Sequence, residues 1–184
     1  RKTNFLSIFM VITIDGPAGV GKTTTAKKLA SKLGYQYLDT GAMYRAVTYF
    51  FGQHSTDITS EDQVKKMLDI LNLELDFTSN DSITVLLDGK DISLLIRSKA
   101  VTDAVSKVSA LQSVREKMVK IQKDTAKNGN FVIEGRDIGT VVFPDVKYKF
   151  FLIADYDTRA KRRFKDFKRV NEELNVNKIK QDLT

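Results

Sequence analysis

The chain has 184 residues, of which 42% are hydrophobic and 29% are charged, enough for one sizeable core with a small accessory subdomain. It contains no cysteine, which excludes a disulfide framework and a thiolate metal site, and no apolar run approaches the roughly 20 residues of a membrane span. The net charge is +7, but residues 159–184 alone carry nine Lys and Arg against four Asp and Glu. Charge this localised argues against a surface extended for nucleic acid.

Residues 1–9 combine a basic start with a short apolar run that is too brief for a secretory signal. We interpret them as a leader, with Met10 as an alternative start. An apolar, β-branched run then predicts a buried strand over residues 11–14. A glycine-rich turn follows, and it matches the phosphate-binding template G-x-x-x-x-G-K-[ST] at Gly16, Gly21, Lys22 and Thr23.

This template has a direct physical reading. Glycines allow the backbone to curl so that successive N–H groups face phosphate oxygens, and the helix that starts there adds its positive end. Lys22 can reach the outer phosphates, and Thr23 can offer a hydroxyl to Mg²⁺. The predicted nucleotide-binding residues are therefore Gly16, Pro17, Ala18, Gly19, Val20, Gly21, Lys22, Thr23 and Thr24.

Strands and helices alternate after the loop. The apolar spacing predicts a helix that ends at Gly34, a strand over residues 35–38, a turn at 39–41 and a second helix from Ala42 to Phe51. His54, the single histidine, is expected in an exposed loop. Because it has no second His or Cys, a histidine-based metal site is not expected.

After the second helix, the spacing of apolar residues first remains helical and then, from residue 73, becomes the alternation of strands. Ser60 and Gln63 form a capping-box pattern that opens another helix. Residues 73–77 and 83–87 read as strands separated by turn residues at 79–81, and Asp88-Gly89 marks a further turn. This pattern predicts a small antiparallel insertion.

Residues 100–126 predict helix, with a break near Ala110-Leu111, and short apolar strands follow at 131–133 and 147–153. Asp155 or Asp157 is expected to cap the basic helix beyond them. Such alternation predicts a parallel sheet covered on both faces, with ligands at the carboxyl ends of its strands. Three motifs fall at strand ends: the glycine loop, Asp39-Thr40, and residues 134–137.

Arginines near these ends are the candidates for holding a second phosphate. The guanidinium of Arg45 suits bidentate phosphate binding, and Arg136 stands next to Asp137 at a strand end. Arg159 and Arg163 lie four apart on a basic helix face and are expected to close over the phosphates as a lid. An acceptor that already carries a phosphate supplies its own nucleophilic oxygen, so no catalytic histidine is required.

Four segments together resemble bacterial cytidylate kinase, a member of the P-loop nucleoside monophosphate kinase superfamily. They read GPAGVGK at 16–22, LDTGAMYR at 38–45, EGRDIGTVVFP at 134–144 and RAKRR at 159–163. The resemblance runs from about Met10 to the end, and its second and third motifs are specific to that family. It implies Mg²⁺-dependent transfer of a phosphoryl group from ATP to CMP and dCMP.

The resemblance also implies roles for single residues. The acceptor phosphate would be held by Thr40, Arg45 and Arg136, and the cytosine edge would be read by Ser106, Arg115 and Asp137. Cytosine presents an amino donor beside ring acceptors, so a carboxylate paired with Arg and Ser can complement it. Glu134 would assist Thr23 at Mg²⁺ through water. The catalytic group would comprise Lys22, Arg136, Arg159 and Arg163.

For the fold, the resemblance implies an α/β, three-layer P-loop kinase core with a parallel sheet. The division we expect is a leader at 1–9, the core at 10–40 and 116–155, a monophosphate-binding part with the small sheet at 41–115, and a basic helical lid at 156–184. Thr40 stands where serine is common in the family, and the hydroxyl is kept. Family members continue beyond the position of Thr184 with more of the lid, a strand and a helix, so we expect residues 1–184 alone to be weakly active or inactive.

Three alternatives remain beside this interpretation. A GTP switch would need an N-K-x-D guanine reader, and residues 177–180 lack the Asp. A nucleic-acid-binding NTPase would need a Walker B acid, for which only Glu134 could serve. Another small-molecule kinase is the closest competitor. We expect a cytoplasmic monomer that binds CMP or dCMP and ATP, and neither nucleic acid nor membrane.

Overall fold

The computed structural model describes residues 9–77, 83–127 and 129–168, with side chains omitted at 163 and 165–168. Its larger sheet has four strands in the order β2-β6-β1-β7, and all three pairings are parallel. The strands are β1 (Val11–Asp15), β2 (Gln36–Asp39), β6 (Phe131–Gly135) and β7 (Tyr148–Phe151). Glu134 is paired with Ile14 on one side and with Asp39 on the other. The three motif-bearing strands therefore end at one edge of the sheet, as predicted.

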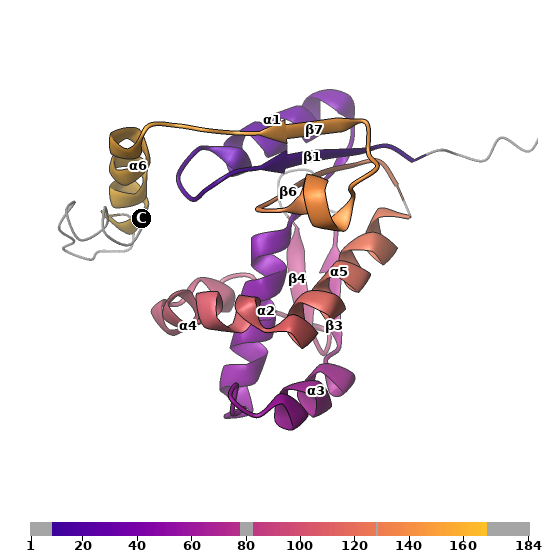
Figure 1. The fold of residues 1–184 in the computed structure, drawn as a ribbon, viewed down its shortest axis with the longest axis vertical. Helices are drawn as coiled ribbons and strands as arrows, with labels where there is room; N and C mark the ends of the chain where they lie inside the picture. Colours follow the sequence, from indigo (N-terminus) through magenta and orange to yellow (C-terminus); the bar gives the residue numbers. More distant parts are fainter. Residues whose placement is uncertain (1–8, 78–82, 128, 169–184) are drawn as a thin grey trace, which may run out of the picture.

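Helices cover this sheet on two faces (Figure 1). Alternate side chains of the strands point to opposite faces. On one face, α1 (Lys22–Leu33) packs through Ala26 and Ala30 against Ile12 and Ile14. On the other face lies the main core, to which α2 (Thr40–Gln53) and α5 (Gln112–Ala126) contribute. Its largest fully buried members include Phe50, Phe131, Leu38, Met43, Ile96, Met118 and Ile133. This arrangement confirms the predicted three-layer α/β fold.

The predicted insertion is a second sheet. It follows α3 (Glu61–Ile70) and consists of β3 (Leu73–Asp76), β4 (Thr84–Leu87) and β5 (Lys90–Asp91), all antiparallel. Asp88 and Gly89 make its turn with φ values of 49° and 74°, and the Ser60 hydroxyl accepts from the Gln63 amide at 3.4 Å to begin α3. The turn predicted at 79–81 lies outside the described residues.

The start of α2 and the helix break near residue 110 differ in how well the sequence predicted them. The break near residue 110 is confirmed, because extended Leu111 separates α4 (Lys99–Ala110) from α5. The turn predicted at 39–41 is wrong, because α2 begins at Thr40 directly after β2. There the Asp39 carboxylate accepts from the Ala42 amide at 3.1 Å and caps the helix. Two short helices, η1 (Leu95–Arg97) and η2 (Ile138–Val142), were not predicted.

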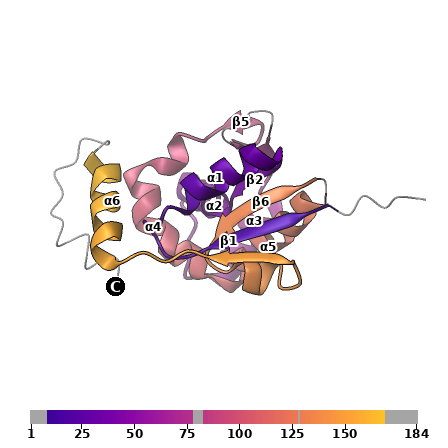
Figure 2. The same cartoon turned by 90° about the horizontal axis from the view of Figure 1, so that it is seen from above.

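The edge strand β7 departs from the expectation of a sheet covered on both faces. It pairs only with β1 within the described part of the chain, and all four of its residues are exposed. An extended segment leads from it to α6 (Tyr156–Lys168), which stands at one end of the molecule in both views (Figure 1, Figure 2). The Asp155 carboxylate accepts from the Thr158 amide at 2.8 Å, so Asp155 is the cap of the predicted pair. None of the helices in the described ranges is long and apolar enough to cross a membrane.

Candidate active site

The glycine loop has the backbone conformation that its sequence predicts. Gly16, Gly19 and Gly21 all have positive φ, at 146°, 77° and 97°, a region that L side chains rarely adopt. A Cβ on Gly16 would collide with the carbonyl oxygen of Leu152, and one on Gly19 would lie 3.0 Å from that of Arg159. Helix α1 starts at Lys22, directly after the loop. Its amino end therefore directs unpaired N–H groups and positive potential at an anion held there.

Cationic side chains surround the carbonyl side of the loop. They donate to five successive backbone oxygens, those of residues 16–20. The contacts are Arg136 Nη1 to Gly16 (3.0 Å), Lys22 Nζ to Pro17 (2.9 Å), Arg159 Nε to Ala18 (2.9 Å), and Arg162 Nη1 to Gly19 (3.3 Å) and Val20 (2.9 Å). The loop thus brings together cations from α1, from the end of β6 and from α6.

Of the two lid arginines chosen from the sequence, Arg159 contacts the loop, whereas the side chain of Arg163 lies outside the described part. Arg162, which was not chosen, makes two of the five contacts. A basic run along a helix does not reveal which member faces a loop more than 140 residues away in sequence.

The Lys22 ammonium is held in an unusual environment. Its side chain is only 8% exposed, and burial, followed by the nearby charge of Arg136, lowers its pKa from 10.5 to about 8. The carboxylates of Glu134, Asp39 and Asp15 oppose that shift. A desolvated ammonium beside a second cation gains a strong partner when a polyphosphate arrives.

Glu134 is a buried acid of the site. The Tyr37 hydroxyl donates to its Oε1, and Thr23 lies close enough to act on its pKa. Burial raises its pKa, and Asp39 adds to the rise, whereas Tyr37, Thr23 and Lys22 oppose it. The structure thus brings together Thr23 and Glu134, the two residues chosen from the sequence for Mg²⁺.

Thr40 and Arg136, two of the residues chosen for the acceptor phosphate, are brought together by the fold although they lie far apart in the sequence. The Thr40 hydroxyl donates to the Glu134 carbonyl at 2.7 Å, which places it beside Gly135 and hence next to Arg136. Arg45, the third, donates from Nη1 to the Thr102 hydroxyl (2.9 Å) and the Ile96 carbonyl (3.3 Å). These contacts direct Arg45 toward α4 and η1.

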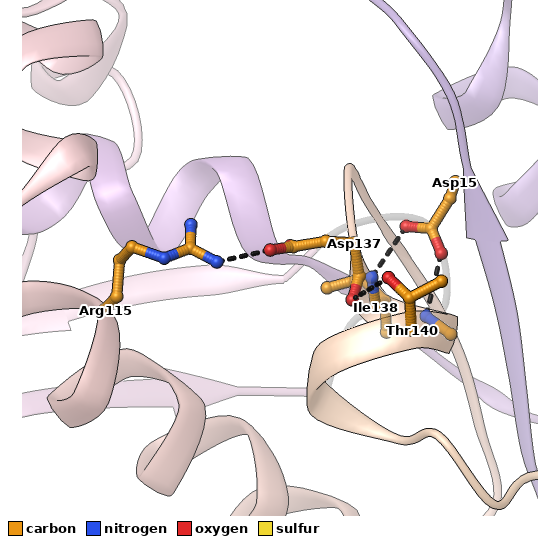
Figure 3. Close-up of polar contacts among 6 residues, drawn as sticks. Asp15, Arg115, Asp137, Ile138 and Thr140 are labelled. Atoms are coloured by element: carbon orange, nitrogen blue, oxygen red, sulfur yellow. Dashed lines mark hydrogen bonds and ion pairs between the residues drawn. The ribbon is translucent and has the colours of Figure 1, made fainter. Parts of the chain in front are cut away.

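Arg115 and Asp137 form an ion pair (Figure 3). Their side chains are 38% and 31% exposed, so both retain surface for a ligand. Tyr44 lies close enough for both charges to act on its pKa, which burial raises. Ser106, the third residue chosen for the base, is exposed on α4. No contact among the described ones joins its hydroxyl to the pair.

Sequence reasoning missed several residues of this site. Asp15 is buried at the end of β1 and accepts from the amides of Ile138 and Gly139 (Figure 3). Tyr37 and Tyr44 were given no role in the site. An acid at the end of an apolar strand, directly before the glycine loop, was the one available signal, since charged residues are rarely buried without partners.

The known proteins to which this chain is similar are cytidylate kinases. A family model described as cytidylate kinase matches residues 12–184. A cytidylate kinase from Protochlamydia amoebophila is 44% identical over 179 residues, covering 95% of this chain and 78% of that protein. Cytidylate kinase 1 of Haemophilus influenzae is 44% identical over 168 residues, covering 91% of this chain and 71% of that protein. A bifunctional pantoate ligase/cytidylate kinase from Prochlorococcus marinus is 49% identical over 159 residues, and the chain spans 31% of its length.

Proposed function

The chain belongs to the cytidylate kinase family, whose members are phosphotransferases acting on nucleotides, and we propose that it transfers the γ-phosphoryl group of ATP to CMP and dCMP. One observation carries this proposal. The ends of β1, β6 and β2 gather the glycine loop with Lys22, the Arg136 guanidinium, and the Arg115–Asp137 pair. A donor polyphosphate and an acceptor nucleotide therefore have adjacent binding groups.

On the donor side, the loop N–H groups and Lys22 would hold the ATP phosphates. Thr23 and Glu134 would hold Mg²⁺, which neutralises phosphate charge and orients the transferred group when bound. The donor set fits this ion, because a hydroxyl and a carboxylate lie near each other. No group of three or more acidic or histidine side chains that could hold a metal occurs in the described ranges. Mg²⁺ commonly uses one or two carboxylates together with substrate phosphates and water, so no larger protein cluster is needed.

On the acceptor side, Thr40, Arg45 and Arg136 would hold the monophosphate, and Arg115, Asp137 and Ser106 would contact the cytosine. A monophosphate oxygen then forms a bond to the γ-phosphorus while the bond from that phosphorus to the β–γ bridging oxygen breaks, giving ADP and CDP. Positioning and charge neutralisation carry most of the rate in such transfers. The cations around the loop, with Arg159 and Arg163 as the lid pair, would supply that neutralisation.

The working division of the chain follows from these roles. We propose residues 10–40 and 116–155 as the core, 41–115 as the monophosphate-binding part, and 156–184 as the lid. The boundaries at 40 and 115 fall at the start of α2 and within α5. A monomeric, cytoplasmic enzyme remains our expectation.

A coupled spectrophotometric assay with ATP and a panel of CMP, dCMP, UMP, AMP and dTMP tests the proposal. We expect kcat/KM for CMP to exceed that for AMP and dTMP by at least about tenfold, a discrimination of roughly 1.4 kcal/mol. Without that preference the cytosine assignment is wrong. Another small-molecule kinase of the same fold is the second candidate, and a different preferred acceptor in the panel would favour it. ATP hydrolysis stimulated by single-stranded nucleic acid would instead favour a nucleic-acid-binding NTPase.

A further inference from the structure

Asp15 is a buried carboxylate for which the proposed reaction has no role. It is the last residue of β1 and directly precedes Gly16, and its side chain is 5% exposed. Its backbone pairs with Gly135 of β6 and with Phe151 of β7, so it sits between the two strands that flank β1. A charge is kept in such a place only when hydrogen bonds compensate its lost hydration.

Both carboxylate oxygens are used. Oδ1 accepts from the Ile138 amide at 2.9 Å, and Oδ2 accepts from the Gly139 amide at 2.8 Å. These amides open η2, whose first turn is closed by the Asp137 carbonyl, which accepts from the Val141 amide at 2.8 Å. Charge-assisted bonds to backbone amides are about twice as strong as neutral ones. Asp15 therefore fixes the segment that begins immediately after Asp137.

The segment before Asp137 is fixed by packing. A Cβ on Gly135 would lie 2.5 Å from Ile138 and 2.7 Å from the Thr40 hydroxyl, so the chain turns back on itself closely at this point. Asp137 is thus held between a tight turn and the Asp15 contacts. The Asp137 carboxylate forms its ion pair with Arg115, which lies on α5 (Figure 3).

We propose that Asp15 is a positioning residue that determines selectivity for the acceptor base. It orients Asp137, and through it Arg115, by holding the amides of Ile138 and Gly139. This inference rests on the proposed function, in which Asp137 and Arg115 contact the cytosine. Since Asp15 also precedes the glycine loop, the same side chain connects the donor loop to the base-reading pair.

Asparagine is the informative replacement. It keeps the size of the side chain, but one oxygen becomes an NH₂ group that faces an N–H donor, so one of the two amide contacts becomes repulsive. The Asp15 charge also acts on the nearby Lys22 ammonium, so Asp15→Asn is expected to alter ATP binding as well. The ratio of kcat/KM for CMP to that for UMP, both at saturating ATP, is insensitive to that side effect.

The experiment measures this ratio in the wild-type protein, Asp15→Asn, Asp137→Asn and the double variant. We expect Asp15→Asn to lower the CMP-to-UMP ratio about five- to twentyfold, as a displaced binding group does, and Asp137→Asn to lower it at least as much. The double variant should then match Asp137→Asn. Asp145→Asn, which removes an exposed charge just after η2, is the matched control and should leave the ratio unchanged.

The outcomes separate the two proposals. If Asp137→Asn lowers the ratio and Asp15→Asn slows both substrates equally, Asp15 is merely structural and the inference is wrong. If Asp137→Asn leaves the ratio unchanged, the base-reading role proposed for Asp137 is wrong and the inference is wrong with it. Should Asp15→Asn fail to fold, as judged by circular dichroism, Asp15→Glu displaces the carboxylate by one methylene and is assayed by the same ratio.

Discussion

The donor side and the acceptor side of this site are built in different ways. The donor side is one contiguous segment, residues 16–24, whose backbone provides the phosphate-binding groups and whose shape depends on three glycines with positive φ. The acceptor side is assembled from side chains on α2, α4, α5 and the end of β6. One is a local backbone feature, and the other exists only when distant helices pack.

This difference predicts how each side responds to change. The phosphate-binding groups of the donor loop are mostly backbone N–H groups, and Lys22 is the main side chain among them, so the loss of Lys22 should act strongly and locally. The acceptor side depends on pairs such as Arg115 with Asp137, in which each member orients the other. Perturbations there should change selectivity more than they change ATP binding.

Among the variants, Lys22→Ala is expected to show the largest difference between its effect on the donor side and its effect on the acceptor side. Removing the ammonium should lower kcat/KM by about 10²- to 10³-fold, the usual effect of deleting one group that stabilises transition-state charge. CMP affinity, measured by calorimetry, should stay within about twofold. Lys28→Ala, an exposed lysine on the same helix, is the control. Equal losses of ATP and CMP binding would contradict the separation.

Gly135, which lies between the donor side and the acceptor side, should not accommodate a larger side chain. Gly135→Ala places a Cβ 2.5 Å from Ile138 and 2.7 Å from the Thr40 hydroxyl, so we expect it to lower the free energy of unfolding by about 1–3 kcal/mol. Gly52→Ala is the control: it lies in α2 with nothing within 4 Å of the added Cβ. There we expect stabilisation by about 0.5–1 kcal/mol. Urea denaturation of both variants measures the difference, and equal stability would contradict the tight turn.

The two sides should also differ in pH dependence. Burial and Arg136 lower the pKa of Lys22 to about 8, and a bound polyphosphate favours the charged ammonium and raises that pKa again. ATP binding should therefore take up protons near pH 8, and affinity should fall by up to about tenfold per pH unit above it. CMP binding should show no such inflection. Calorimetry in buffers of different ionisation enthalpy measures the proton uptake.

A matched variant sharpens this test. Lys22→Arg keeps the positive charge but carries a guanidinium that remains protonated at these pH values. The inflection near pH 8 should disappear in this variant even if its affinity is lower. An inflection that persists would assign the titration to a group other than Lys22.

The smallest effect is expected from Arg162→Ala. This side chain donates to two loop carbonyls but is itself exposed, so solvent screens much of its contribution. We expect ATP affinity to fall about three- to tenfold, with CMP affinity unchanged. Lys161→Ala, its exposed neighbour on α6, should leave both affinities unchanged. A larger loss of ATP affinity for Lys161→Ala than for Arg162→Ala would contradict the observation that α6 turns Arg162 toward the loop.

Much of the fold was predictable because its signals are local. The strand, glycine loop and helix at residues 11–33, the capping serine at 60 and the helix break at Leu111 were all predicted from residue type and spacing, and the structure confirms them. The turn at 39–41 was predicted wrongly because Asp39 and Thr40 favour turns and helix starts alike. The unpredicted η2 is held by Asp15, a residue 123 positions earlier in the chain.

The amino-acid sequence by itself determined where the phosphate-binding loop lies and what backbone shape it takes, because glycine positions and hydrophobic periodicity act over a few residues. Only the tertiary structure decided that Arg162 contacts that loop, that Asp15 holds the start of η2, and that Arg115 pairs with Asp137. Such contacts depend on which face of a helix is turned inward and on how closely two segments approach. Those quantities are set by the packing of the whole core.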